Sequence, residues 1–347
     1  TRRSSDLNHP RPLQGWYTPR GLKKLLEQDI ERSEQFLRDE KFDYLKLRDY
    51  QVKAIQAVEK ALEEKKRSIL IAMATGTGKT RMAIGLIYRL LKAKRFHRIL
   101  FLVDRKALGE QAEAAFKESK MENFHTFAEI YGLQSLYDQK PDSETKVHIA
   151  TVQGMLKRIF YNEKTDDIPP VDQYDCIIVD EAHRGYTLDK EMDEVELQFR
   201  DHQDYVSKYR KVLDYFDAVR IGLTATPALH TTEIFGPPVF TYSYREAVVD
   251  GYLVDHEPPY QFETVLKKEG ITWAKGEKVD VYDTVSGTIS QEYLEDEVNI
   301  EVEHFNTKVI TESFNRVIIR ELTKYISPDD EGKTLIFAAT DDHADLV

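Results

Sequence analysis

The chain has 347 residues, 41% of them hydrophobic and 32% charged, with 49 lysines and arginines against 61 aspartates and glutamates. This length exceeds one ordinary domain of about 100–200 residues, so we expect two compact units. The net charge of −12 argues against a protein that coats nucleic acid by bulk electrostatics. No apolar run approaches the roughly 20 residues that span a bilayer, so we expect no membrane segment and no membrane partner. A single cysteine, Cys176, and the absence of a signal pattern favour the reducing cytoplasm.

The N-terminal part of the chain predicts a linker followed by helices. Residues 1–20 are rich in proline and arginine without a steady apolar period, and we interpret them as a linker from an upstream domain. From Gly21 to Leu62, apolar side chains recur three and four residues apart, which is typical of amphipathic helices.

After this helical lead-in, short apolar runs alternate with amphipathic stretches. The runs predicted to be strands are Ser68–Met73, Ile99–Val103, Val147–Thr151, Cys176–Asp180 and Arg220–Thr224. This alternation predicts an α/β fold, in which a parallel sheet is flanked by helices on both faces. Because such sheets bind ligands beyond the carboxyl ends of their strands, the polar residues that follow each strand are the candidates for function.

The alternation stops near residue 250. Residues 251–306 are mixed in pattern and are interpreted as a segment between two lobes, whereas 21–250 would hold the helical lead-in and the first lobe. A long amphipathic helix is predicted over Thr307–Ile326, and a strand over Lys333–Ala339. Residues 307–347 are therefore predicted to be the start of a second α/β lobe.

The first predicted strand leads directly into the loop MATGTGKT, residues 73–80, and then into a predicted helix. That context is the one a phosphate-binding loop requires, although Met73 occupies the place of the usual first glycine. Lys79 would reach the β- and γ-phosphates of ATP, and the hydroxyl of Thr80 would bind Mg²⁺. The predicted ATP-binding residues of the loop are Thr75, Gly76, Thr77, Gly78, Lys79 and Thr80.

Two acids, Asp180 and Glu181, follow the strand that begins at Cys176. Asp180 would lie near Mg²⁺, and Glu181 would orient or deprotonate the attacking water. Alone, such a pair is more often part of a solvated loop, but a phosphate loop about 100 residues upstream favours catalysis. Lys79, Asp180 and Glu181 are thus the predicted catalytic residues.

Two further segments are less specific. The hydroxyls of Thr224 and Thr226 are predicted to bond His183 and to couple the ATP site to its surroundings, with a local Ser/Thr turn as the alternative. Gln51, in LRDYQ ahead of the first strand, offers the donor and the acceptor that an adenine base requires.

In this order, LRDYQ, ATGTGKT, DEAH and TATP resemble the motifs of superfamily 2 helicases and translocases. DEAHRGY at 180–186 and the stretches 209–228, 240–256 and 309–315 are similar, more narrowly, to the motor subunit of type I restriction-modification enzymes. The resemblance implies two RecA-like lobes that bind ATP and Mg²⁺ between them. It also implies ATP-driven translocation on double-stranded DNA, alongside methylation and specificity subunits.

The resemblance carries over to four DNA-contacting positions, Arg105, Lys106, Thr151 and Gln153. For the two basic residues, an ordinary solvated helix start is an equal alternative. The family's nuclease domain would lie before Thr1 and its second-lobe arginines after Val347, so the resemblance implies a motor fragment. Two other functions stay open, namely a strand-separating helicase and a nucleotide-gated docking scaffold, although the intact acids and Lys79 argue against the scaffold.

Overall fold

The computed structural model describes residues 13–43, 45–122, 125–135, 137, 141–161, 168–182, 202–256, 271–282, 289–294, 297–300, 312–326, 333–338 and 340–347. The chain divides into two compact units, Thr1–Asp255 and His256–Val347. Within the described ranges, no helix has the length and apolar character needed to cross a membrane.

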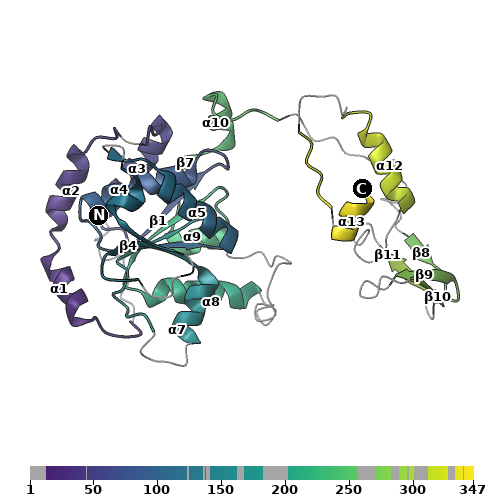
Figure 1. Ribbon diagram of the computed structural model, residues 1–347, viewed down its shortest axis with the longest axis horizontal. Helices are drawn as coiled ribbons and strands as arrows, with labels where there is room; N and C mark the ends of the chain where they lie inside the picture. The colour runs from purple at the N-terminus through teal and green to yellow at the C-terminus, as the bar shows by residue number, and fades with distance from the viewer. Residues whose placement is uncertain are drawn as a thin grey trace. The chain divides into compact units, whose positions relative to one another are not determined.

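The first unit is built on a seven-stranded sheet, and all its strands run parallel (Figure 1). The spatial order is β3-β4-β2-β5-β6-β1-β7. The strands are β1 (Ser68–Met73), β2 (Ile99–Val103), β3 (Gly132–Gln134), β4 (Thr145–Thr151), β5 (Cys176–Val179), β6 (Val219–Thr224) and β7 (Phe240–Tyr242). The predicted RecA-like α/β fold is therefore confirmed for this unit, and the five predicted strands form its centre, with β3 and β7 added at the edges.

Helices cover both faces of this sheet. They are α1 (Pro19–Glu27), α2 (Ile30–Asp39), α3 (Asp49–Glu63), α4 (Lys79–Lys92), α5 (Lys106–Glu118), α6 (Phe127–Ile130), α7 (Val152–Phe160), α8 (His202–Tyr215), α9 (Leu229–Phe235) and α10 (Tyr244–Val249). Along β1, Ile69 and Ile71 pack in the core under α3, α4 and α5, whereas Leu70 packs in the core formed with α7, α8 and α9. Figure 1 shows α7 and α8 on the opposite side of the strands from α3, α4 and α5. Because both faces are buried, these strands are continuous apolar runs.

Arg89 of α4 connects the lead-in helices α2 and α3 to α4, and its side chain has no exposed surface. Its guanidinium donates to Glu59 Oε1 at 2.6 Å, to the carbonyl of Leu37 at 2.6 Å and to that of Glu40 at 2.9 Å. Burial raises the pKa of Glu59, and the hydrogen bond from Arg89 opposes that rise. Arg89 thus joins α2, α3 and α4.

The last part of the predicted linker contacts the first unit. The Tyr17 hydroxyl donates to the carboxylate of Asp217, and the Thr18 hydroxyl donates to Asp172 Oδ2 at 2.6 Å. Thr18 also caps α1, since its Oγ1 accepts the backbone N–H of Gly21 at 3.0 Å. Residues 1–12 lie outside the described ranges.

The second unit contains two antiparallel strand pairs and two helices. They are β8 (Ile271–Trp273), β9 (Lys278–Tyr282), β10 (Ile289–Tyr293), β11 (Val298–Ile300), α12 (Glu312–Leu322) and α13 (Asp341–Leu346). β9 pairs with β10, and β8 pairs with β11. The predicted helix over 307–326 is present as α12, and residues 307–311 lie outside the described ranges.

The predicted strand at Lys333–Ala339 is wrong for residues 333–338, which form no regular structure, and Ala339 is not among the described residues. The side chains of Leu335 and Phe337 are 77% and 87% exposed. A strand needs a hydrogen-bonded neighbour, and no described strand pairs with this run. The start of a second RecA-like lobe stays a prediction.

Candidate active site

The phosphate loop leaves β1 and enters α4 through two glycines with positive φ, 82° at Gly76 and 79° at Gly78. Residues with side chains rarely adopt this left-handed conformation. At Gly78, a Cβ would also lie 2.6 Å from Gln51 Nε2, so a side chain there would displace the amide of Gln51. Gly78 is the N-cap of α4, whose first N–H groups have no partner within the helix and suit an anion.

Lys79, at the end of this loop, contacts Glu181, and the catalytic role of both residues stays a prediction. Lys79 is only 8% exposed, and its Nζ lies 3.4 Å from Glu181 Oε1. Glu181 follows β5 and has a positive φ of 48°. The next residue, Ala182, donates its N–H to the carbonyl of Leu223 in β6 at 2.8 Å. This bond anchors the acidic turn to the strand that separates β5 from β1.

Asp180 is held at the end of β5 by backbone bonds. Its N–H donates to the carbonyl of Leu102 in β2 at 2.9 Å, and its Oδ1 accepts the N–H of Glu181 at 3.0 Å. Burial, followed by the charge of Glu181, raises the pKa of Asp180 to about 6, against the weaker opposing effect of Lys79. The half-buried carboxylate of Asp180 therefore has too little positive charge near it to hold its pKa at the ordinary value.

A magnesium ion would supply that charge, because Mg²⁺ prefers oxygen ligands and binds through one or two carboxylates together with substrate phosphates. Asp180 and the hydroxyl of Thr80, the second residue of α4, are such ligands. Across the described ranges, no group of three or more histidines, cysteines and acids forms a metal site by itself. These residues thus fit a magnesium ion that arrives with a nucleotide.

Gln51 of α3 is buried and binds the phosphate loop itself. Its Nε2 donates to the carbonyls of Thr77 at 3.0 Å and Gly78 at 3.2 Å, and its Oε1 accepts the N–H of Arg48 at 3.0 Å. Since both amide protons are engaged, an adenine amino group would have to use the second lone pair of Oε1. Adenine recognition by Gln51 stays a prediction.

The TATP segment follows β6 and forms a local turn. The N–H of Thr226 donates to Thr224 Oγ1 at 3.2 Å, and that hydroxyl donates back to the carbonyl of Thr226, also at 3.2 Å. These bonds match the Ser/Thr-turn alternative, although the following helix, α9, has Ala228 as its N-cap and no side-chain cap bond. His183 lies outside the described residues, so its coupling to the two threonines stays a prediction.

The four candidate DNA-binding residues lie at the carboxyl ends of two neighbouring strands, where β2 and β4 pair Val103 with Thr151. Lys106 is exposed, and Arg105 is half-buried with its Nε 3.7 Å from Asp104 Oδ2. Thr151 is the N-cap of α7 and accepts the N–H of Gly154 at 3.0 Å, while Gln153 follows in the first turn. The fold therefore places them on the same edge of the sheet as the phosphate loop.

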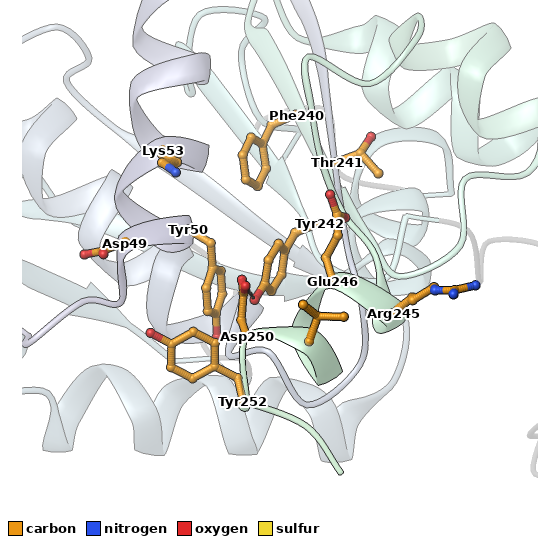
Figure 2. A pocket seen from close by; sticks show the side chains of 11 residues that line it. Asp49, Tyr50, Lys53, Phe240, Thr241, Tyr242, Arg245, Glu246, Asp250 and Tyr252 are labelled. Atoms are coloured by element: carbon orange, nitrogen blue, oxygen red, sulfur yellow. Dashed lines mark hydrogen bonds between the residues drawn. The ribbon is translucent and has the colours of Figure 1, made fainter. Parts of the chain in front are cut away.

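Two tyrosines that the sequence did not single out also belong to this site. The Tyr50 hydroxyl donates to the carbonyl of Thr77 at 2.8 Å, and its ring stacks on that of Tyr242 with 4.0 Å between centroids. Figure 2 shows both rings on the wall of a pocket of about 740 Å³ between α3, β7 and α10. Because Tyr50 is next to Gln51, the sequence could have identified it as a site residue. The stacking of Tyr50 on Tyr242 joins residues far apart in the chain, so no local sequence pattern predicts it.

Comparison with known proteins places these features in a family. Residues 44–229 match the family described as type III restriction enzyme, res subunit. The sequence is 48% identical to the type I restriction enzyme EcoKI endonuclease subunit of Escherichia coli K12 over 98% of this chain, and 30% identical to the EcoAI endonuclease subunit of Escherichia coli over 86%. The chain spans 29% and 33% of the length of these two relatives.

Among solved structures, the chain is similar to a fragment of an HsdR subunit of a type I restriction enzyme from Vibrio vulnificus. The identity is 26%, the match covers 66% of this chain and 36% of that one, and the TM-score is 0.42. The curated relatives confirm the resemblance to type I restriction enzymes that the motifs indicated.

Proposed function

Because the chain belongs to the family of type III restriction enzyme res subunits, we propose that it is an ATP-dependent motor that translocates along double-stranded DNA. In this proposal it serves a type I restriction endonuclease, in the cytoplasm, together with methylation and specificity subunits, and it pulls DNA before cleavage. The contact between Lys79 and Glu181 beneath the phosphate loop carries the proposal, since it brings a phosphate-binding cation and a water-activating acid to one point.

Each side chain of the site has a distinct task. The glycines of the loop let backbone amides surround the phosphates, and Lys79 binds the β- and γ-phosphate oxygens. Thr80 and Asp180 hold Mg²⁺, which when bound offsets the negative charge of the phosphates. The carboxylate of Glu181 orients the attacking water and accepts its proton. When phosphate oxygens replace Glu181 as the partner of Lys79, that carboxylate becomes available to the water.

The ends of β2 and β4 provide the proposed DNA contacts. Arg105 and Lys106 supply positive charge, and Thr151 and Gln153 supply polar groups that suit phosphate oxygens. Contacts of this kind follow the backbone and carry no sequence information, which is what a motor that moves along DNA requires.

The test is steady-state phosphate release by the intact protein with its partner subunits, with and without linear duplex DNA. We expect the duplex to stimulate hydrolysis and its strands to stay annealed, and we expect Lys79→Ala to remove nucleotide binding or turnover. Unwinding of a forked duplex as efficient as ATP hydrolysis would instead support the strand-separating helicase. Nucleotide binding without turnover in the wild-type protein would support the docking scaffold.

A further inference from the structure

We propose that Tyr50 and Tyr242 are positioning residues, which hold the phosphate loop in shape and connect it to residues 250–253 near the end of the first unit. This inference rests on the proposed function, because it concerns the same ATP site. It concerns two side chains that would not touch the nucleotide but that fix the loop which does.

The two tyrosines hold the phosphate loop at both of its ends. At the start of the loop, the N–H of Ala74 donates to the backbone carbonyl of Tyr242 at 2.9 Å, where β7 pairs with β1. Near its end, the carbonyl of Thr77 accepts the hydroxyl of Tyr50 at 2.8 Å as well as the amide of Gln51 at 3.0 Å. Within the loop, the N–H and the hydroxyl of Thr77 both donate to the carbonyl of Ala74, at 3.3 Å and 2.6 Å, and the outside contacts add to this internal turn.

The stacked rings of Tyr50 and Tyr242 form a packing contact between α3 and β7. They are nearly parallel, at 10°, with 4.0 Å between centroids, and both residues are buried. Two neighbours fix the ring of Tyr50 further. Arg48 donates to its hydroxyl at 3.0 Å, and the ring of Tyr252 meets it edge-on at 5.1 Å. Figure 2 shows the three rings grouped beside Asp250.

The same group reaches the segment that follows α10. The Tyr242 hydroxyl donates to Asp250 Oδ2 at 2.7 Å, and the N–H groups of Tyr252 and Leu253 both donate to the carbonyl of Ala247. Leu253 Cδ2 lies 3.1 Å from the position that a Cβ would take at Gly76. The segment thus contacts the loop directly and is also joined to it through the stacked tyrosines, so a shift of either one requires the other to repack.

The opposite face of the sheet offers a matched control. The hydroxyl of Tyr215 donates to the carbonyl of Pro169 at 2.7 Å, a buried bond of the same kind as that from Tyr50 to Thr77. Tyr215 belongs to the core formed with α7 and α8, where its ring meets those of Phe160 and Phe216 edge-on. Tyr215→Phe therefore removes an equivalent bond without any effect on the loop's shape.

The experiment measures the Kd of Mg²⁺–ADP by calorimetry, and KM and kcat for ATP, in the intact protein. Tyr50→Phe loses the bond to Thr77 and the bond from Arg48, and it should raise the Kd and KM about fivefold, the usual effect of losing the one bond that reaches the loop, with kcat changed less. Tyr242→Phe keeps the stack and the bond to Ala74 and loses only Asp250, so we expect a rise of about twofold. Tyr215→Phe should leave nucleotide binding unchanged while it lowers the unfolding temperature as much as Tyr50→Phe does.

Equal Kd and KM values for Tyr50→Phe and Tyr215→Phe, whether raised or unchanged, would overturn the positioning role. A Lys79→Ala variant in the same series separates the two levels of inference. If it binds and hydrolyses ATP like the wild type, the ATP site itself is misplaced and both proposals fail. If it loses binding or turnover while Tyr50→Phe and Tyr215→Phe stay alike in Kd and KM, only the positioning role fails.

Discussion

Two parts of one sheet edge hold their charged side chains in different ways. At the ends of β1 and β5, Lys79 is 8% exposed and contacts Glu181, whereas at the ends of β2 and β4, Lys106 is exposed and Arg105 is half-buried. Charges withdrawn from water interact more strongly and are less screened by salt. The buried part is therefore suited to a fixed geometry for chemistry, and the exposed part to reversible contacts with a polymer that moves past.

The largest effect should come from the buried part. Glu181→Gln keeps the size of the side chain and the ligand Asp180 but cannot accept a proton from water. We expect ATP to bind as before and hydrolysis to slow by about 10²–10⁴-fold, the usual contribution of a positioned base. Single-turnover hydrolysis would measure it, with nucleotide affinity as the control. Wild-type rates in this variant would remove Glu181 from catalysis.

Asp180 should show the cost of a charge that is partly withdrawn from water. Because its folded pKa of about 6 lies above the ordinary value near 3.9, ionisation of Asp180 destabilises the fold. That loss of stability is absent below about pH 4, grows as the pH rises through the folded pKa, and is complete above it. Asp180→Asn should therefore raise the free energy of unfolding by about 3 kcal/mol at pH 7 without nucleotide.

Denaturant unfolding at pH 7 and pH 4 would measure this difference. The two proteins should converge at the lower pH, and the gain at pH 7 should be accompanied by loss of Mg²⁺-dependent nucleotide binding. An equal free energy of unfolding at pH 7 would show that another charge compensates Asp180.

The exposed part should respond to salt instead. Replacing Arg105 and Lys106 together by alanine should weaken binding of duplex DNA about tenfold at moderate salt and reduce the slope of log affinity against log salt by about 2. Lys117→Ala, at the far end of the same helix, where it pairs with Glu113 at 2.6 Å, is the matched control. An unchanged salt slope in the double variant would favour the solvated helix start.

Thr151 should give the smallest effect, because its hydroxyl already caps α7. Thr151→Ala should cost about 1 kcal/mol of stability through the lost cap, and Thr151→Ser should restore it. Thermal unfolding measures the cap, and DNA affinity measured beside it tests the second role. If Thr151→Ala loses stability but binds DNA like the wild type, the hydroxyl serves the helix alone.

The centre of the sheet could be predicted because its signal is local. Ile99–Val103 is an unbroken apolar run, and it forms a strand buried on both faces. The edge strands β3 and β7 were missed, since each has three residues and only partial burial and forms by pairing with a distant strand. The strand predicted at 333–338 was wrong because strand formation also depends on pairing: the run is apolar, but no described strand pairs with it.

In the site, sequence motifs were enough to place Lys79 and Glu181 at the carboxyl ends of strands in one sheet, because each lies at a fixed place relative to its strand. The motifs did not reveal that Gln51 donates both amide protons to carbonyls of the phosphate loop. Nor did they reveal the stack of Tyr50 on Tyr242, since those residues are joined only by the approach of α3 to β7. Side-chain roles that depend on contacts between residues distant in sequence can be identified only from the three-dimensional structure.

The guanidinium of Arg89 limits how short a stable piece of this protein can be. A chain cut just before β1 would lack Glu59 and the carbonyls of Leu37 and Glu40, and it would expose Arg89 together with the apolar surface of α4 that packs against α3. Burial of one aliphatic side chain stabilises a fold by about 1.5–3 kcal/mol, so exposure of several would remove a large share of the 5–15 kcal/mol that keeps an ordinary domain folded. A recombinant fragment that begins ahead of α2 should therefore be recovered as a folded protein, and one that begins at the phosphate-loop strand should aggregate.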